Sequence, residues 1–205
     1  LLGVLDQRQL AHSLFPLGDS LKPQVRAEAA ALGFAVAAKP DSNDICFIPD
    51  GDTAGFLADK LGAAPGRIVD IAGNHLGEHQ GTFRYTIGQR KGLNLGVPSV
   101  EGRPRYVVGI DPDARQVTVG TLDDLVVDEL HGIRPTWTSE PPRGRWRGKV
   151  QVRAHGEAMD AWIETRPDDV VMRLDSGCRG VAPGQYAVCY DGERVVGSSV
   201  ISGAS

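Results

Sequence analysis

The first forty residues carry hydrophobic positions at helical spacing. Apolar side chains recur on one side of a helix between Gln7 and Phe15, and Pro16 ends the pattern. A second helix is predicted over Val25–Leu32, which is rich in alanine and is followed by Gly33. Residues 34–37 predict a short strand. The order helix, helix, strand is typical of the end of an α/β domain.

A third helix is predicted from Asp52 or Thr53 to Leu61, where a polar cap precedes apolar positions at helical spacing and Gly62 follows. Beyond it the pattern changes to short apolar or alternating runs, which predict strands. These runs are 67–70, 106–111, 116–120, 146–153, 158–165, 170–174, 186–190 and 195–201. From Ile133 onward they recur at roughly ten-residue spacing, which favours a small β-barrel or sandwich, and Asp191-Gly192 predicts a hairpin turn.

The changes of pattern place one boundary near residue 50 and another within 122–132. We therefore expect three segments, 1–50, 51–125 and 126–205. The 26 glycines and 13 prolines among 205 residues fit turns between short strands better than a helical bundle, and 41% hydrophobic residues exclude wholesale disorder.

Composition also indicates the cellular compartment in which the protein is expected. No apolar run approaches the roughly 18 residues that span a bilayer, and we expect no signal peptide and no membrane partner. Three cysteines are too few, and odd in number, for a disulfide scaffold, so the cytoplasm is expected. Because residue 1 is Leu, we expect a piece of a longer protein.

The net charge of −4 hides two basic stretches. Residues 82–110 hold five basic side chains against Glu101, and residues 131–155 hold six against Glu140. A polyanion such as RNA could bind there, although basic loops are also commonly just solvated.

Cys46 is a candidate nucleophile, because it is a single thiol in a loop between two predicted segments. The alternative is a buried apolar cysteine between Ile45 and Phe47. Aspartates at 41, 44, 50 and 52 would raise its pKa if they lay close, which opposes thiolate formation. The same aspartates do not fit a calcium loop, and Cys178 and Cys189 predict core packing rather than zinc, so no metal is expected.

The densest polar stretch runs from Glu78 to Leu93. Its glycines allow tight turns, and Arg90-Lys91 could meet a phosphate. No phosphate-binding loop is present, because the segment from Gly144 to Lys149 has the wrong spacing and ends in Val150.

Taken together, five groups of residues resemble one family. They are Leu14-Phe15-Pro16-Leu17-Gly18 with Lys22-Pro23-Gln24-Val25-Arg26, Asp41-Ser42 through Ile45-Cys46-Phe47-Ile48, Gly77-Glu78-His79-Gln80-Gly81, Gly88-Gln89-Arg90-Lys91-Gly92-Leu93, and Ala182-Pro183-Gly184-Gln185 with Tyr190-Asp191-Gly192. Their order closely resembles the tRNA-specific 2-thiouridylase family over essentially the whole chain.

The resemblance implies an α+β, mostly β fold: the helical tail of a catalytic α/β domain with the cysteine loop (1–50), a small mixed central domain (51–125) and a C-terminal antiparallel β-barrel (126–205). It implies an ATP-using sulfurtransferase that places sulfur at C2 of the wobble uridine, U34, in tRNAs for Lys, Glu and Gln. A sulfur-donor protein loads a persulfide on one cysteine. Cys46 matches the second cysteine, which helps to release that sulfur and forms a disulfide with the first.

The sequence also departs from the family pattern. The pyrophosphate loop, the persulfide-bearing cysteine and a Lys-Asp-Gln-Ser tRNA motif have no counterpart here, so ATP would bind to a missing N-terminal region and this piece alone is expected to be inactive. The family's Arg-Tyr pair that touches tRNA matches Arg153 and Ala154, which keeps the phosphate contact and loses the aromatic one. Gln185 matches a further tRNA contact, although a plain turn residue is the alternative.

Two other functions stay open from the residues alone. One is a stand-alone RNA-binding β-barrel module without catalytic activity. The other is a thiol redox protein that uses Cys46 and requires a lowered thiol pKa.

Overall fold

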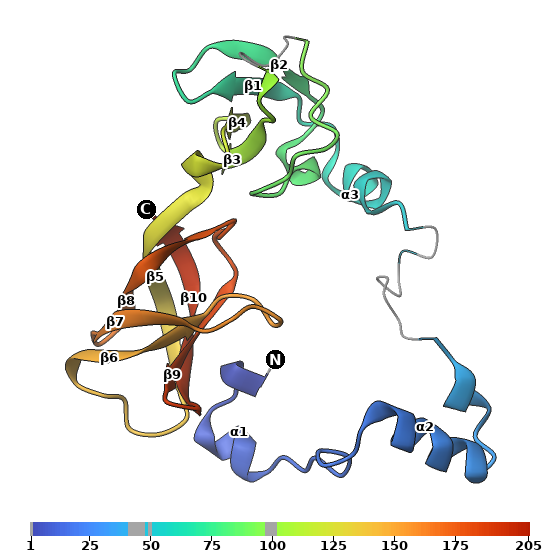
Figure 1. Cartoon of the computed structure of the whole chain (residues 1–205). Coiled ribbons are helices and arrows are strands. Elements are labelled where there is room, and N and C mark those ends of the chain that lie inside the picture. Colours follow the sequence, from blue (N-terminus) through green and yellow to red (C-terminus); the bar gives the residue numbers. More distant parts are fainter. Residues whose placement is uncertain (1, 41–47, 49–50, 97–101) are drawn as a thin grey trace.

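The structure is a computed structural model, and it describes residues 2–40, 48, 51–96 and 102–205. It is mostly β, as predicted, with a four-stranded mixed sheet and a closed six-stranded antiparallel barrel (Figure 1). In the described part of the chain, no helix is both long and apolar enough to cross a membrane.

The N-terminal segment holds η1 (Leu2–Val4), α1 (Gln7–Ala11), α2 (Lys22–Ala31) and η2 (Ala35–Ala38). Asp6 and Gln9 form a reciprocal cap at the start of α1, with the Asp6 carboxylate accepting the Gln9 N–H at 2.7 Å. Helix α1 ends earlier than predicted, and Leu14 and Phe15 lie in irregular backbone before a turn that begins at Pro16.

The predicted strand at residues 34–37 is wrong. The backbone makes local 3₁₀ bonds instead, from Ala37 N–H to the Phe34 carbonyl (3.0 Å) and from Lys39 N–H to the Val36 carbonyl (3.0 Å). No neighbouring strand is paired with it among the residues that the structure describes, and an apolar tetrapeptide without such a partner satisfies its own backbone.

No side chain of these four N-terminal elements is buried. Leu14, for example, is 88% exposed. The segment touches the barrel through η1, where Gly3 packs against the side chain of Val188. Its apolar residues therefore stabilise little in this chain.

The central part begins with α3 (Thr53–Leu61), which matches the prediction and is capped by the Asp52 carboxylate. The sheet order is β2-β1-β4-β3, with β1 (Gly66–Asp70) and β4 (Gln116–Gly120) parallel and both edge pairs antiparallel. The edge strands are β2 (His75–His79) and β3 (Tyr106–Asp111). The sequence did not predict β2, because most residues of this strand are polar and show no apolar alternation. Only Leu76 and His79 of the strand are buried. The 3₁₀ turn η3 (Thr82–Arg84) follows.

After the 3₁₀ turn η5 (Asp123–Leu125), the barrel closes in the order β10-β5-β8-β7-β6-β9. Its strands are β5 (Val126–Trp137), β6 (Gly144–Gln151), β7 (Met159–Thr165), β8 (Asp169–Arg179), β9 (Tyr186–Asp191) and β10 (Arg194–Ala204). The alternating inward residues fill the interior, among them Leu130, Val150, Ile163, Met172 and Ile201.

Two details of the barrel differ from the predicted strands. Strand β5 begins at Val126, well before the first predicted signal at Ile133, and β6 ends at Gln151, so Arg153 lies beyond it. The β9–β10 hairpin is present, but Asp191 pairs with Arg194 and the two loop residues are Gly192 and Glu193. Gly192 takes the positive φ (60°) that the first position of such a loop requires.

Candidate nucleic-acid interface

Cys46 lies outside the described residues, together with Asp41, Asp44 and Asp50. The structure therefore tests neither its role nor the pKa predicted for it. Of the four aspartates, only Asp52 is described, and it caps α3.

Arg153 and Ala154 lie exposed in the loop that follows β6. The Nη2 group of Arg153 donates to the backbone carbonyls of Arg179 (3.1 Å) and Gly180 (3.3 Å), where β8 ends. These bonds hold the guanidinium at the end of β8, and the guanidinium has further N–H groups that can donate to a ligand. Ala154 offers only a methyl group, so it cannot stack on a base.

A hollow of about 620 Å³ opens beside Arg153. The charged residues of its lining are Arg153, Arg179 and Glu157. The other described residues of the lining are Val126, Val152, Gly156, Met159, Gly177 and Cys178. Sequence reasoning did not single out Arg179, although an arginine at the end of a strand, next to a glycine, is a feature that could have pointed to it. The two arginines suit a phosphate oxygen better than a base.

Gln185 lies in the loop between β8 and β9, the same loop that anchors Arg153. Its side-chain Oε1 accepts the Ala182 N–H at 3.2 Å, and its backbone carbonyl accepts the Ile201 N–H at 2.7 Å. The residue thus takes part in the turn, and its contact with tRNA stays a prediction. The structure brings Arg153, from the β6–β7 loop, into contact with the start of the β8–β9 loop that carries Gln185.

The two described cysteines are not activated thiols. Burial raises the pKa of Cys189 to about 12, and burial also raises the pKa of the half-buried Cys178. Both are free, and Cys189 packs with its Sγ 3.9 Å from the Met172 sulfur. In the described part of the chain, no cluster of His, Cys, Asp or Glu could hold a metal ion.

The basic residues of β6 do not form a uniformly positive face. Arg147 makes a bidentate ion pair with Asp175, with one N–O distance of 2.7 Å, and both Arg145 and Arg147 lie over the Trp162 ring at 4.6 and 5.5 Å. Farther round the barrel, Arg173 of β8 pairs with Glu129 of β5 at 2.5 Å.

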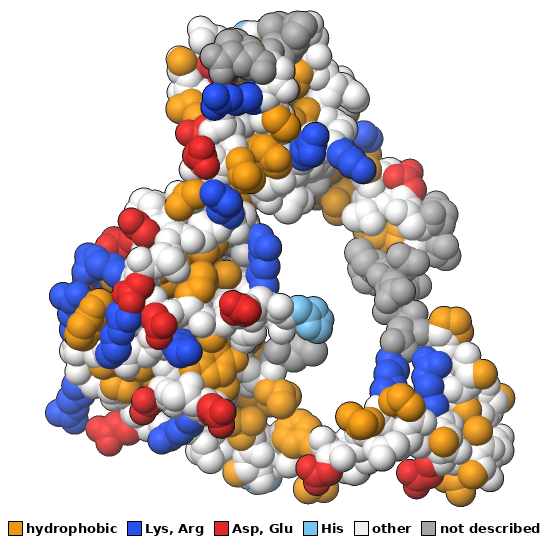
Figure 2. Space-filling model, viewed as in Figure 1, with side chains coloured by type: hydrophobic (Ala, Val, Ile, Leu, Met, Phe, Trp, Pro, Cys, Tyr) orange, Lys and Arg blue, Asp and Glu red, His pale blue; other side chains and the backbone are white. Residues whose placement is uncertain are grey.

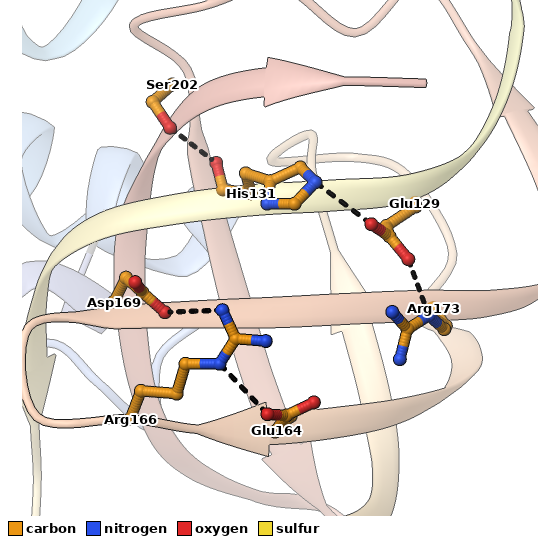
Figure 3. A network of polar contacts seen from close by, with 7 residues as sticks. All are labelled: Glu129, His131, Glu164, Arg166, Asp169, Arg173 and Ser202. Atoms are coloured by element: carbon orange, nitrogen blue, oxygen red, sulfur yellow. Dashed lines mark hydrogen bonds and ion pairs between the residues drawn. The ribbon is translucent and has the colours of Figure 1, made fainter.

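Figure 3 shows how this pairing continues across three strands. Glu129 also contacts His131 at 3.0 Å, and Arg166 bridges Glu164 and Asp169. Acidic and basic side chains alternate on the visible face of the barrel (Figure 2). Within residues 131–155, Arg147 pairs with Asp175. Arg145 and Lys149 stand opposite Glu164 and Asp160 of β7, so the basic residues of β6 are largely balanced once the chain folds.

His79 is a buried residue whose role the sequence did not reveal. It is 3% exposed, its Nδ1 accepts the Gly81 N–H at 3.0 Å, and its Nε2 donates to the Arg115 carbonyl at 3.2 Å. Burial lowers its pKa, so the neutral ring links β2 to the β3–β4 turn. Within the segment Glu78–Gly81, His79 therefore has a structural role.

Three family models match the chain. They are described as the tRNA methyl transferase HUP domain (residues 1–50), the tRNA methyl transferase PRC-barrel domain (54–121) and the aminomethyltransferase beta-barrel domain (127–201).

Curated relatives are similar over nearly the whole chain. A tRNA-specific 2-thiouridylase MnmA of Acidothermus cellulolyticus is 58% identical over 98% of the chain and 56% of the relative. Those of Cutibacterium acnes and Streptomyces coelicolor are 56% and 54% identical, again over 98% of the chain and over 55% and 54% of their own lengths. The chain spans about half the length of the curated relatives it matches. It belongs to the tRNA-specific 2-thiouridylase family.

Proposed function

We propose that this chain is part of an enzyme that replaces the C2 oxygen of wobble uridine U34 with sulfur in tRNAs for Lys, Glu and Gln. The similarity to named 2-thiouridylases, 58% identity over 98% of the chain, carries the proposal. Its partners would be tRNA and a sulfur-donor protein in the cytoplasm.

In this proposal Cys46 is the resolving thiol. A persulfide on a second cysteine attacks C2, the activated oxygen leaves, and the Cys46 thiolate attacks the inner sulfur. C2 then keeps one sulfur, the two cysteines share a disulfide, and a thiol reductant restores them. The two described cysteines, both with raised pKa, are poor candidates for either role.

The residues that the structure describes form no phosphate-binding loop for ATP. The one lysine that follows closely spaced glycines, Lys149, lies within strand β6 rather than in a loop before a helix. We therefore assign ATP to a part of the protein other than these 205 residues. On that assignment, this chain alone does not thiolate tRNA.

We also propose that residues 1–50, 51–125 and 126–205 are the end of the catalytic domain, a central domain and the barrel domain. The separate ranges of the three family matches support this division. Arg153 would contact a tRNA phosphate and Gln185 would line the same surface, while Ala154 would add no stacking.

The catalytic proposal is tested in the whole protein with Cys46→Ser. We expect 2-thiouridine to disappear from tRNA hydrolysates measured by mass spectrometry, while tRNA binding is retained. Cys189→Ala is the matched control, because it removes a buried thiol of raised pKa that does not line the hollow beside Arg153, and it should leave the modification intact. A normal 2-thiouridine content in the Cys46 variant would remove that residue from the mechanism.

The second candidate, an RNA-binding barrel without catalysis, is favoured by the hollow beside Arg153. It predicts that the whole protein binds tRNA but thiolates none when ATP and a persulfide donor are supplied. Thiolation under those conditions excludes it.

A further inference from the structure

A second hollow lies in the central part, away from the barrel hollow beside Arg153. It measures about 370 Å³ and is lined by three arginines, Arg90, Arg103 and Arg105. The other described residues of its lining are Leu93, Asn94, Leu95, Gly102 and Pro104. Arg90 and Arg103 are exposed, and Arg105 is half-buried. None of these lining residues is acidic.

The turn that leads to Arg90 is held by hydrogen bonds at both of its ends. The Gln89 side chain accepts the Thr86 N–H (3.0 Å) and donates to the Lys91 carbonyl (3.0 Å), so it ties both ends of the turn. The backbone of Gly88 donates to Val107 in β3 at 2.8 Å, and Val107 donates back to Gln89 at 2.9 Å. Four hydrogen bonds therefore fix the segment that ends in Arg90, which lowers the entropy cost of holding a ligand there.

Arg103 and Arg105 lie on the residues that lead into β3. Each of them already has an interaction within the protein, so a phosphate would share these side chains with that interaction.

The turn before Arg90 comes close to the loop that anchors Arg153. A Cβ placed on Gly88 would come within 3.8 Å of the Gly180 backbone, in the loop that anchors Arg153. Basic side chains are visible along the lower edge of the central part in Figure 2. One polyanion could therefore meet both groups of arginines.

We propose that the Arg90–Arg103–Arg105 hollow binds a backbone phosphate of the bound tRNA. Three arginines that line one hollow can donate to the several oxygens of a phosphodiester, and no aromatic side chain is among the described residues of the lining to stack a base. The inference rests on the proposed function, and it adds a contact on the central part that is independent of Cys46 and of the barrel residues.

The test is the salt dependence of tRNA binding by the whole protein, measured by filter binding for the unaltered chain and for Arg90→Gln and Arg103→Gln. Each variant should weaken binding at low salt roughly tenfold. Each should also flatten the slope of log K against log salt by roughly 0.7–0.9, the value for one lost phosphate contact. Arg143→Gln, a 93%-exposed arginine in the β5–β6 loop, is the matched charge control and should leave the slope unchanged.

The outcomes separate the two proposals. If the unaltered protein does not bind tRNA, the proposed function fails, and this inference fails with it. If the unaltered protein binds but the Arg90 and Arg103 variants keep its slope, or the Arg143 control loses as much, only the phosphate site is overturned. A shift of the arginine side-chain NMR signals with inorganic phosphate, without any change of the tRNA slope, assigns the hollow to a free anion and also overturns it.

Discussion

At the scale of single residues, the structure gives several side chains roles that their identity did not announce. Arg153 is both an exposed cation and a donor to the backbone at the end of β8, and Gln185 and Gln89 tie turns with their amides. His79 holds a neutral ring between two backbone groups. Such residues position a surface before any ligand arrives.

The first prediction concerns His79 and pH. Its folded-state pKa is lowered by burial, so below about pH 6.5 the unfolded chain binds the extra proton before the folded chain does. Stability should therefore fall as pH drops below 6.5. In His79→Leu this part of the pH dependence should vanish, and stability at pH 8 should be lower by about 1–3 kcal/mol, because the buried Gly81 N–H loses its acceptor.

Urea unfolding at pH 8, 6.5 and 5.5 measures both effects. If the variant does not fold, NMR titration of His79 in the native and urea-unfolded protein decides the point. A folded-state pKa equal to or above the unfolded one would contradict the prediction.

The second prediction uses two glycines with the same backbone conformation. Gly180 (φ 69°) and Gly192 (φ 60°) both require a positive φ, so alanine should cost about 1 kcal/mol at either position. Only at Gly180 would the new methyl group meet Arg153, at 2.6 Å from Nη2, while nothing lies within 4 Å at Gly192.

Because a side-chain end can move cheaply, the two variants should unfold at similar temperatures. Gly180→Ala should nevertheless weaken tRNA binding, since Arg153 loses its anchor, and Gly192→Ala should not. Calorimetry and filter binding measure the pair, and equal tRNA affinities would argue against Arg153 as a tRNA contact.

At the scale of elements, closure of the barrel sorts neighbouring residues onto two unlike faces. On β8, Met172 points inward and is fully buried, while the adjacent Arg173 points outward to Glu129. The inward residues form the core, and the outward ones form the alternating ion pairs of Figure 3. The stability of the barrel should therefore depend on the inner face.

The third prediction compares those two neighbours. Met172→Ala should lower the free energy of unfolding by about 2–5 kcal/mol, because it opens a cavity in the barrel core. Arg173→Ala breaks a half-exposed ion pair and should cost less than about 1 kcal/mol. Denaturant unfolding of both variants checks this, and equal losses would show that the outer pairs matter as much as the core.

At the scale of the whole molecule, the parts differ in how much apolar surface they bury. The barrel and the mixed sheet each have a core of fully buried residues, whereas no residue of the N-terminal helices is buried. Burial of apolar area is the main source of stability, so these parts should fold with unequal independence.

The fourth prediction follows from that difference. A segment of residues 122–205 should fold cooperatively and give a dispersed NMR spectrum, while residues 1–40 alone should remain unfolded by circular dichroism. A helical, protected 1–40 peptide would contradict this account of its stability.

Local sequence was enough where neighbouring residues set the outcome. Helix α3 with its Asp52 cap, strands β3 and β4, and the β9–β10 hairpin follow from capping, alternation and glycine conformation, which act over a few residues. The motif order likewise pointed to the family that the comparisons confirm. The predicted strand at 34–37 failed because a strand needs a partner, and no local pattern supplies one.

What only the tertiary structure decided is which distant residues meet. The closure of six strands placed carboxylates beside the arginines of β6, which turned a basic stretch into a balanced face. Barrel closure also joined Arg153 to the end of β8, and the fold of the central part placed three arginines from two segments around one hollow. Charge counted along a chain cannot show this, because electrostatic interactions depend on distance in space and not on separation in sequence.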